Sequence, residues 1–106
     1  MDKKLLGRRI NLARKDKGLT SEKLSEACNI NATYLRQIEA GSRTPSLPIF
    51  ISICEHLSVS PSYLLADQLN NDEASEMDIL FELWRKATPK QIKMITSIIR
   101  SALENT

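Results

Sequence analysis

The chain has none of the long apolar runs, and few of the metal-binding residues, on which membrane, secreted and metal-binding proteins depend. No run approaches the about 18 uninterrupted apolar residues of a membrane helix, and the first residues, MDKKLLGRRIN, lack the apolar stretch of a signal peptide. One histidine, His56, and two cysteines, Cys28 and Cys54, are too few for a four-ligand zinc site. We therefore expect a cytoplasmic protein without metal or cofactor, in which both thiols are buried as small apolar side chains.

Glycine and proline are also scarce, with three and four copies. Nowhere do β-branched residues alternate with polar ones over five or more positions, so the usual signature of strands and hairpins is missing. Apolar residues recur instead at helical spacing, and the sequence predicts an all-α fold. A length of 106 residues with 42% apolar residues is enough for one packed core.

Basic residues are concentrated in the first part of the sequence. Residues 1–66 hold ten lysines and arginines against six aspartates and glutamates, a net charge of +4. Residues 67–106 hold five against seven, a net charge of −2. This asymmetry suggests a polyanion as the partner of the first part and a different task for the second.

Capping residues divide residues 1–66 into five predicted helices. Gly18 and Gly41 suit the left-handed conformation that follows a helix, and Asn29 tolerates the same conformation in a tight turn. Thr20 and Asn31 are favourable N-cap residues for the helices that follow them. The five predicted helices are about residues 3–17, a short one after Thr20, about 32–40, one capped by Ser46, and a short one from about Ser60.

Residues 67–72, DQLNND, are polar and form the predicted hinge before a C-terminal helical pair over residues 73–106. The first helix of the pair has an apolar stripe at helical spacing, formed by Met77, Leu80, Phe81 and Trp84. The second begins with a capping box, Thr88-Pro89-Lys90-Gln91. The sequence thus predicts a five-helix bundle followed by a helical hairpin.

The segment from Ser21 to Ile38 has the spacing of two helices that cross at a steep angle around a short turn. Such a pair needs apolar residues at the fourth, eighth, tenth, fifteenth and eighteenth places, which here are Leu24, Cys28, Ile30, Leu35 and Ile38. Ser25 is small at the fifth place, where the helices cross, and Asn29 suits the left-handed ninth place. A pair of this kind holds its second helix above the surface, where the N-terminal end can enter the major groove of DNA.

These residues resemble the helix-turn-helix family of phage repressors and Cro proteins, also called the xenobiotic-response-element family. The matching segments, all between residues 6 and 65, are Leu6-Gly7 with Ile10 and Arg14, Gly18-Leu19-Thr20, Tyr34 to Ser46, Leu57 with Val59-Ser60, and Tyr63-Leu64-Leu65. Four positions depart from the family pattern. Ser21 stands where Gln usually opens the second helix, which weakens one expected phosphate contact, and the others are Ala13, Asn29 and Ser58.

The resemblance implies a prokaryotic or phage-encoded protein whose recognition helix covers residues 32–40. The positions that face base edges in the family are here Ala32, Thr33, Arg36 and Gln37. Their chemistry agrees with this role, because Arg pairs with guanine, Gln with adenine, and the Ala and Thr methyl groups contact thymine. The alternative is that Arg36 and Gln37 are only the solvated face of a short helix.

The same resemblance implies phosphate contacts and one structural ion pair. Phosphate contacts are expected at helix ends and loops, namely at Thr20, Ser21, Tyr34, Ser42, Arg43 and Thr44. Arg14 and Glu39 are expected to form an internal ion pair between the first and third helices, because a carboxylate near an inner helix face is costly unless it is paired.

Residues 73–104 carry more apolar surface than one helical stripe requires, and such a surplus usually marks an interface. Because the family is commonly dimeric on palindromic operators, we expect a homodimer. The predicted interface consists of Phe81, Trp84, Ile92, Ile95, Ile98 and Ile99. The alternative is that this surface packs back on Ile49 and Ile51 of the fourth helix.

The predicted function is that of a sequence-specific DNA-binding transcriptional regulator, a dimeric repressor associated with the nucleoid when bound. The alternative is a protein-interaction module, antitoxin-like or anti-repressor-binding, whose residues 73–104 bind a different protein. No enzyme is expected, because His56 has no cysteine nucleophile or glycine elbow at recognisable spacing and phosphate-cradling glycine motifs are absent.

Overall fold

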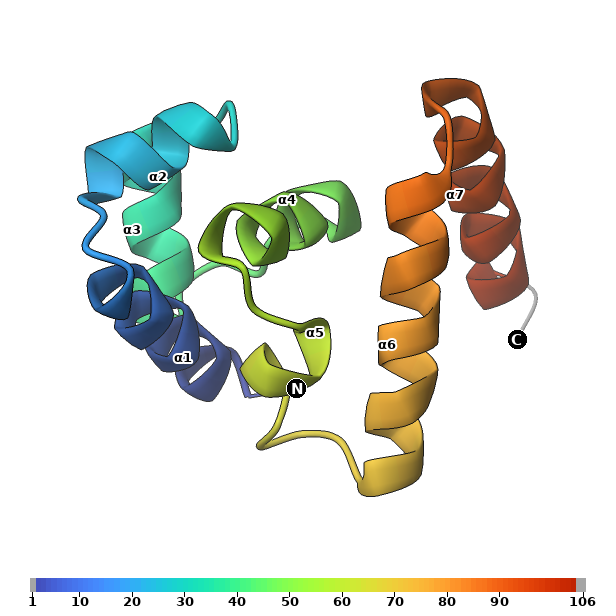
Figure 1. Ribbon diagram of the computed structural model, residues 1–106, viewed down its shortest axis with the longest axis horizontal. Helices are drawn as coiled ribbons and strands as arrows, with labels where there is room; N and C mark the ends of the chain where they lie inside the picture. Colours follow the sequence, from blue (N-terminus) through green and yellow to red (C-terminus); the bar gives the residue numbers. More distant parts are fainter. Residues whose placement is uncertain (1, 105–106) are drawn as a thin grey trace.

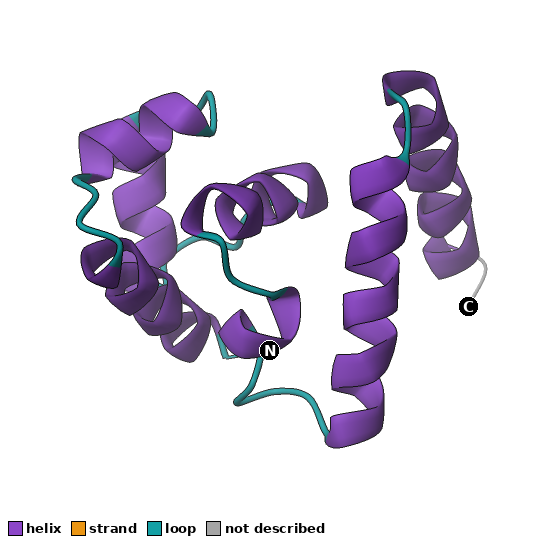
Figure 2. Cartoon of the chain, in the orientation of Figure 1, coloured by secondary structure: helices purple, strands orange, loops and turns teal. Residues whose placement is uncertain are grey.

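Seven helices and no strand form residues 2–104, the part of the chain that this computed structural model describes (Figure 1 and Figure 2). The helices are α1 (Lys3–Asp16), α2 (Ser21–Ala27), α3 (Ala32–Ala40), α4 (Leu47–Leu57), α5 (Pro61–Leu64), α6 (Asn71–Lys86) and α7 (Pro89–Glu104). The prediction of an all-α fold is confirmed. The predicted domain ranges also include Met1, Asn105 and Thr106, which lie outside the described residues.

Left-handed residues follow the first four helices, where the sequence predicts turns. Gly18 and Gly41 have φ values of +74° and +80°, after α1 and α3. Asn29 and Ser58, which stand where the family usually has glycine, have φ values of +57° and +55° after α2 and α4. A left-handed asparagine is tolerated because its short polar side chain can hydrogen-bond locally, whereas a left-handed serine is less usual.

The starts of α4, α6 and α7 differ in how their first N–H groups are satisfied. The predicted capping box of α7 forms, with the Gln91 backbone N–H donating to Thr88 Oγ1 at 3.2 Å and the Thr88 N–H donating to Gln91 Oε1 at 2.9 Å. An equivalent box at α6, between Asn70 and Glu73, was not predicted. Ser46 occupies the capping position of α4, but the prediction that its side chain caps the helix is wrong, since it makes no capping hydrogen bond.

The main core lies where α1 to α5 meet. Its most deeply buried side chains are Ile10, Leu24, Leu35, Ile38, Ile53, Cys54 and Leu64. Gly7 lets α1 pass directly over the end of α3, because a Cβ at this position would come within 2.5 Å of the Glu39 carbonyl oxygen and closer still to that of Ile38. The crossing of α1 and α3 therefore depends on a residue without a side chain.

Helix α6 completes this core, which corrects the predicted role of two of its residues. Phe81 and Trp84 are only 8% and 5% exposed and belong to the same buried cluster as Ile51 of α4. They were predicted to form a dimer interface, but their side chains are already covered by their own chain. Within the chain α6 contacts α5 most extensively, and these two side chains are buried there without a second copy.

Two residues of the predicted hinge at 67–72 make polar contacts with α1 and the residue that caps it. Asp67 forms an ion pair with Arg9 of α1 at 2.6 Å, and the Arg9 guanidinium lowers the pKa of the Asp67 carboxyl through this hydrogen bond. Gln68 exchanges hydrogen bonds with the backbone of Asp2. Because α6 already begins at Asn71, only residues 65–70 connect the bundle to the hairpin, and polar contacts hold this connection to α1.

Helix α7 lies on the outer side of α6, away from the first five helices (Figure 1). None of its described residues is fully buried, although Ile92 and Ile95 pack against the core cluster. Between residues 2 and 104, no helix is both long enough and apolar enough to cross a lipid bilayer.

Candidate nucleic-acid interface

Helices α2 and α3 are joined by a turn whose two ends are capped by side chains. Thr20 Oγ1 accepts the Lys23 N–H at the start of α2, and Asn31 Oδ1 accepts the Tyr34 N–H at the start of α3 at 2.7 Å. Leu35 and Ile38 anchor α3 in the core. One side of α3 is therefore fixed by apolar burial, and the opposite side faces solvent.

The four predicted base-reading residues lie on the part of α3 that is not buried. Thr33 and Arg36 are exposed, and Ala32 and Gln37 are half-buried. Arg36 Nη1 lies 3.4 Å from Glu22 Oε1, so that the two helices of the motif are linked by an exposed ion pair. This partner of Arg36 was not predicted, because nothing in the local sequence indicates which charged residue of α2 faces α3.

The segment after α3 brings Tyr34 and Arg43 together. The Arg43 guanidinium lies over the Tyr34 ring, with its central carbon 5.5 Å from the ring centroid, in a cation–π arrangement. Ser42 Oγ donates to the Gln37 carbonyl oxygen at 3.1 Å, and the backbone N–H groups of Ser42 and Arg43 donate to the same oxygen. Of the groups predicted to contact phosphate here, Arg43, Tyr34 and the exposed Thr44 have polar atoms to offer, whereas Ser42 would first have to give up its hydrogen bond.

At the start of α2, Thr20 is exposed and Ser21 is half-buried. Because Thr20 Oγ1 acts as acceptor in the cap, its hydroxyl hydrogen can still donate to an anion. Lys23 follows in the first turn and is exposed. The first turn of α2 therefore presents an alcohol donor and a cation together, which suits a phosphate group.

Sequence reasoning did not include Lys4 in the site, although it lies beside Gly41. A Cβ at Gly41 would come within 2.8 Å of the Lys4 Cα, so the first turn of α1 touches the end of α3. Lys4 is exposed and adds a cation near the Arg43 segment. Only the packing of α1 on α3 brings these positions together, and no local sequence signal could have identified them.

The predicted ion pair between α1 and α3 is present. Arg14 Nε and Nη2 donate to the two carboxylate oxygens of Glu39 at 2.9 and 3.0 Å, while Arg14 Nη1 donates to the Leu19 carbonyl oxygen at 2.8 Å. The Asn11 amide also donates to Glu39 Oε1. All polar contacts of this pair are made inside the protein, so its role is to fix the orientation of α3 relative to α1.

The cysteines are buried, one of them at the end of α2, and the histidine lies on α4. Both thiols are free and buried, and burial raises the pKa of Cys54 to about 12. His56 is exposed, with Nδ1 2.8 Å from the Ser52 carbonyl oxygen and 3.9 Å from Cys28 Sγ. Among the described residues, no group of three histidines, cysteines, aspartates or glutamates is arranged to hold a metal ion.

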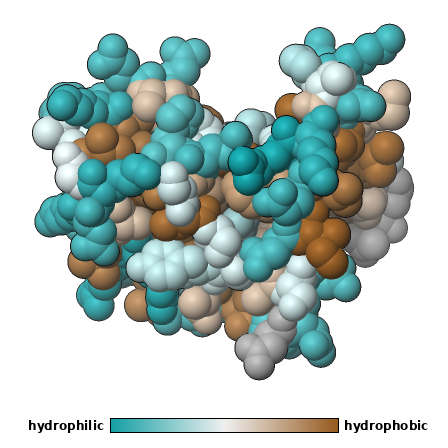
Figure 3. Space-filling view, viewed as in Figure 1, coloured by the Kyte–Doolittle hydropathy of each residue, from teal (hydrophilic) through white to brown (hydrophobic). Residues whose placement is uncertain are grey.

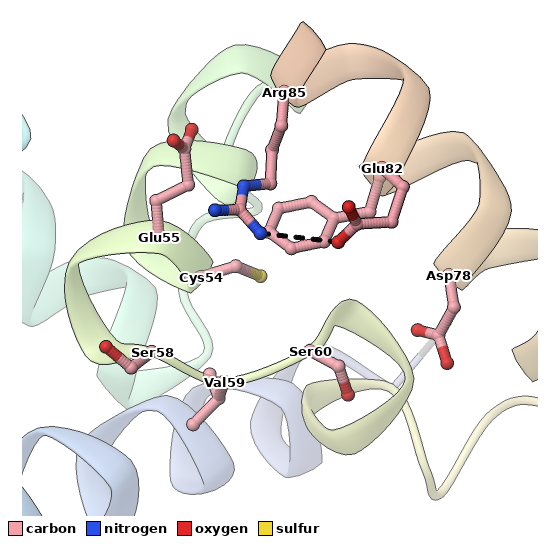
Figure 4. Close-up of a pocket in the computed structure, with 9 residues that line it drawn as sticks. Cys54, Glu55, Ser58, Val59, Ser60, Asp78, Glu82 and Arg85 are labelled. Atoms are coloured by element: carbon pink, nitrogen blue, oxygen red, sulfur yellow. Dashed lines mark hydrogen bonds and ion pairs between the residues drawn. The ribbon is translucent and has the colours of Figure 1, made fainter.

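A cleft opens between the end of α4, the turn before α5, and α6 (Figure 4). Arg85 forms an ion pair with Glu82 on one wall, at 3.3 Å. On the same helix, Asp78 Oδ2 accepts the Ser62 hydroxyl at 3.0 Å. None of the residues predicted to contact DNA lines this cleft.

Two capped helices around a tight turn, with the second anchored by its apolar side and flanked by cations, define a helix-turn-helix DNA-binding protein. The model of the helix-turn-helix family HTH_3 matches residues 10–64, and the chain belongs to this family. The resemblance inferred from the sequence is therefore confirmed.

Three similar proteins bear the names of regulators or controller proteins. Over 64 residues the chain is 38% identical to the uncharacterized HTH-type transcriptional regulator YazB of Bacillus subtilis (strain 168). This match covers 60% of the chain and 93% of YazB. The structure is similar to the restriction-modification controller protein C.AhdI of Aeromonas hydrophila, with TM-score 0.57 and 28% identity over 59% of this chain and 96% of that chain. It is also similar to the clp gene regulator ClgR of Corynebacterium glutamicum, with TM-score 0.60 and 27% identity over 80% and 84%. The chain is a DNA-binding transcriptional regulator.

Proposed function

We propose that the chain is a dimeric repressor that recognises a palindromic operator by inserting the N-terminal part of α3 into the major groove. The observation that carries this proposal is the orientation of α3, which buries Leu35 and Ile38 and leaves Thr33 and Arg36 exposed. Arg36 would read guanine and Gln37 adenine, while Ala32 and Thr33 would contact thymine methyl groups.

Phosphate contacts on either side of α3 would set its register in the groove. Thr20 and Ser21 lie at the start of α2, and Tyr34, Arg43 and Thr44 lie near the two ends of α3. The cation–π contact with Tyr34 restrains the Arg43 side chain, so less conformational entropy is lost when Arg43 binds a phosphate. Ser42 joins this set only if its hydroxyl leaves the Gln37 carbonyl oxygen.

Dimerisation through α6 and α7 would give the protein the two-fold symmetry of its operator. With Phe81 and Trp84 excluded, the α7 residues of the predicted interface are the exposed Ile98 and the half-buried Ile92, Ile95 and Ile99. A bound dimer would repress by covering a promoter and would be found on the nucleoid. A chain that remains monomeric would instead leave this surface for a different protein.

Binding to the DNA that flanks the protein's own coding region tests the proposal. If a dimer neutralises about 6 to 10 phosphates, log K should fall with log salt concentration at a slope of roughly −5 to −9. The measurement is fluorescence anisotropy of a labelled duplex at several salt concentrations. A slope near zero, or no binding at low salt, contradicts the DNA-binding role of these residues.

Three substitutions separate base reading from anchoring. Arg36→Ala or Gln37→Ala should cost about 1 to 3 kcal/mol on the preferred site and relax discrimination at one or two base pairs of each half-site. Arg43→Ala should weaken binding to all sequences about equally. Lys93→Ala removes an exposed cation of α7 and is the control that should change neither property. Uniform loss from the first two changes would assign Arg36 and Gln37 to positioning.

A further inference from the structure

The hairpin of α6 and α7 exposes large apolar side chains on both helices. The four that concern us are 58% to 61% exposed: Ile79 and Leu83 on α6, and Met94 and Ile98 on α7. Hydrophobic residues are visible over this part of the molecule in the space-filling view (Figure 3). Four large exposed apolar side chains on one small hairpin exceed what isolated surface residues explain.

Helical geometry places these four side chains on one face of the hairpin. Each of them directly precedes a more buried residue, and those residues are Leu80, Trp84, Ile95 and Ile99. Two antiparallel right-handed helices wind in opposite senses when both are viewed from the same end. A residue one position before the residue that points toward the other helix therefore lies on the same side of the hairpin in both helices. We call this surface, formed by Ile79, Leu83, Met94 and Ile98, the hairpin face.

Charges of opposite sign flank the hairpin face at its two ends. On α6 the same stripe begins with Asp72 and Glu76 and ends with Lys86, at successive intervals of three or four residues. On α7 it begins with Lys90, one turn before Met94. The turn between α6 and α7 lies at one end of the hairpin, here called the tip, and the start of α6 lies at the other end, the base (Figure 1). On this stripe the tip therefore carries Lys86 and Lys90, and the base carries Asp72 and Glu76.

These four charged groups have no ion-pair partner in the chain itself, as far as residues 2–104 describe it. All four side chains are exposed. The apolar centre and both charged ends are therefore available to a partner.

We infer that the hairpin face binds the hairpin face of a second copy, with the two hairpins antiparallel. This inference rests on the proposed dimer, but it moves the interface from the half-buried Ile92, Ile95 and Ile99 to the exposed hairpin face, and it specifies the orientation of the two copies. A two-fold axis through the apolar centre places the basic tip of each copy against the acidic base of the other. Each attraction between Lys86 or Lys90 and Asp72 or Glu76 then occurs twice.

Charge decides between this arrangement and the other symmetric one. With the hairpins parallel, the two basic tips would face each other, and so would the two acidic bases, which is repulsive. A surface whose two ends carry opposite charge is complementary to itself only when one copy is reversed. A second copy is therefore the partner that the observed distribution of charge fits.

Paired charge reversals test the orientation. Lys86→Glu with Lys90→Glu makes both ends of the hairpin acidic, and Asp72→Lys with Glu76→Lys makes both ends basic. Each variant alone should raise the dimer dissociation constant by about tenfold or more, since every attraction becomes a repulsion. An equimolar mixture of the two should form a mixed dimer with a dissociation constant close to that of the original chain. Sedimentation equilibrium with one variant labelled measures both quantities.

The outcomes separate this inference from the proposed dimer. If the unaltered chain is monomeric at about 100 µM, the dimer itself is absent and the inference fails with it. If the chain dimerises but the reversals have no effect, or the mixture does not recover, the dimer stands and the antiparallel orientation is wrong. Recovery on mixing requires both variants to be folded, so misfolding cannot imitate it.

The unaltered chain provides a second measurement if a reversed variant does not fold. Raising NaCl from about 50 mM to about 500 mM should weaken an antiparallel dimer, because the facing charges are exposed and are screened by salt. A parallel dimer would be strengthened by the same change. An increase in affinity with salt would overturn the inference.

Discussion

The Arg14 guanidinium holds the Glu39 carboxylate by two hydrogen bonds, of 2.9 and 3.0 Å, with the two side chains only 10% and 7% exposed. One residue belongs to α1 and the other to α3. The pair therefore ties α3 to α1 at a largely buried point. Its effect on DNA binding is indirect, through the orientation of α3.

Removing one partner of this pair should be costly. Glu39→Ala should lower the free energy of unfolding by about 3 to 5 kcal/mol, because it leaves the Arg14 charge buried without its partner. Replacing both residues, with Arg14→Met and Glu39→Leu, should recover part of the loss. Urea unfolding followed by circular dichroism measures both effects. An unchanged unfolding midpoint in Glu39→Ala would mean that the pair does not contribute to stability.

The ion pair between Arg36 and Glu22 should compete with DNA. Because Glu22 holds Arg36 and also repels phosphates, Glu22→Gln should tighten binding to the operator by about two- to fivefold at low salt. Glu82→Gln is the matched control, since it removes a carboxylate that pairs with Arg85 on α6. Equal effects of both substitutions in anisotropy titrations would attribute the gain to net charge alone.

A side chain at Gly7 and a side chain at Gly18 should be unfavourable for different reasons. Gly7→Ala places a Cβ against the carbonyl oxygens of Ile38 and Glu39 and should cost about 3 kcal/mol or more, because the helices must move apart. Gly18→Ala meets no atom within 4 Å and should cost about 1 to 2 kcal/mol, from its positive φ alone. Thermal unfolding of both variants checks the order. A smaller loss for Gly7→Ala would contradict the close crossing of α1 and α3.

Trp84 should stabilise the monomer and not the dimer. Trp84→Ala should cost about 3 to 5 kcal/mol, since it leaves a cavity in the apolar core of one chain. Ile98→Ala, at an exposed position of α7, should change the stability of a monomer by less than about 0.5 kcal/mol. If the loss in Trp84→Ala varied with protein concentration, Trp84 would belong to an interface between chains.

The buried thiols should be unreactive in the folded protein. With the pKa of Cys54 raised to about 12, only about one molecule in 10⁴ carries its thiolate at pH 8, and burial also blocks access to a reagent. Burial raises the pKa of Cys28 as well. Ellman's reagent should therefore titrate both thiols in guanidinium chloride and neither of them rapidly in native buffer. Reaction of either thiol within seconds in native buffer would contradict their burial.

The sequence by itself determined where most helices begin and end. Capping residues act through hydrogen bonds to their own backbone three residues away, so Thr20, Asn31 and the box at Thr88 could be identified without a fold. The left-handed backbone at Gly18 and Gly41 could also be predicted from the sequence, because the constraint on φ is local. Resemblance to the family added the pairing of Arg14 with Glu39, which no local rule provides.

Only the tertiary structure decided which surfaces cover the apolar stripes. Periodicity shows that Phe81 and Trp84 share one face of a helix, but it does not show whether that face meets the chain's own core or a second chain, since either burial satisfies the same hydrophobic pattern. For the same reason, the contact of Lys4 with Gly41 could not be predicted, nor the ion pair of Arg36 with Glu22. These contacts join residues that are far apart in sequence, and their geometry exists only after the helices have packed.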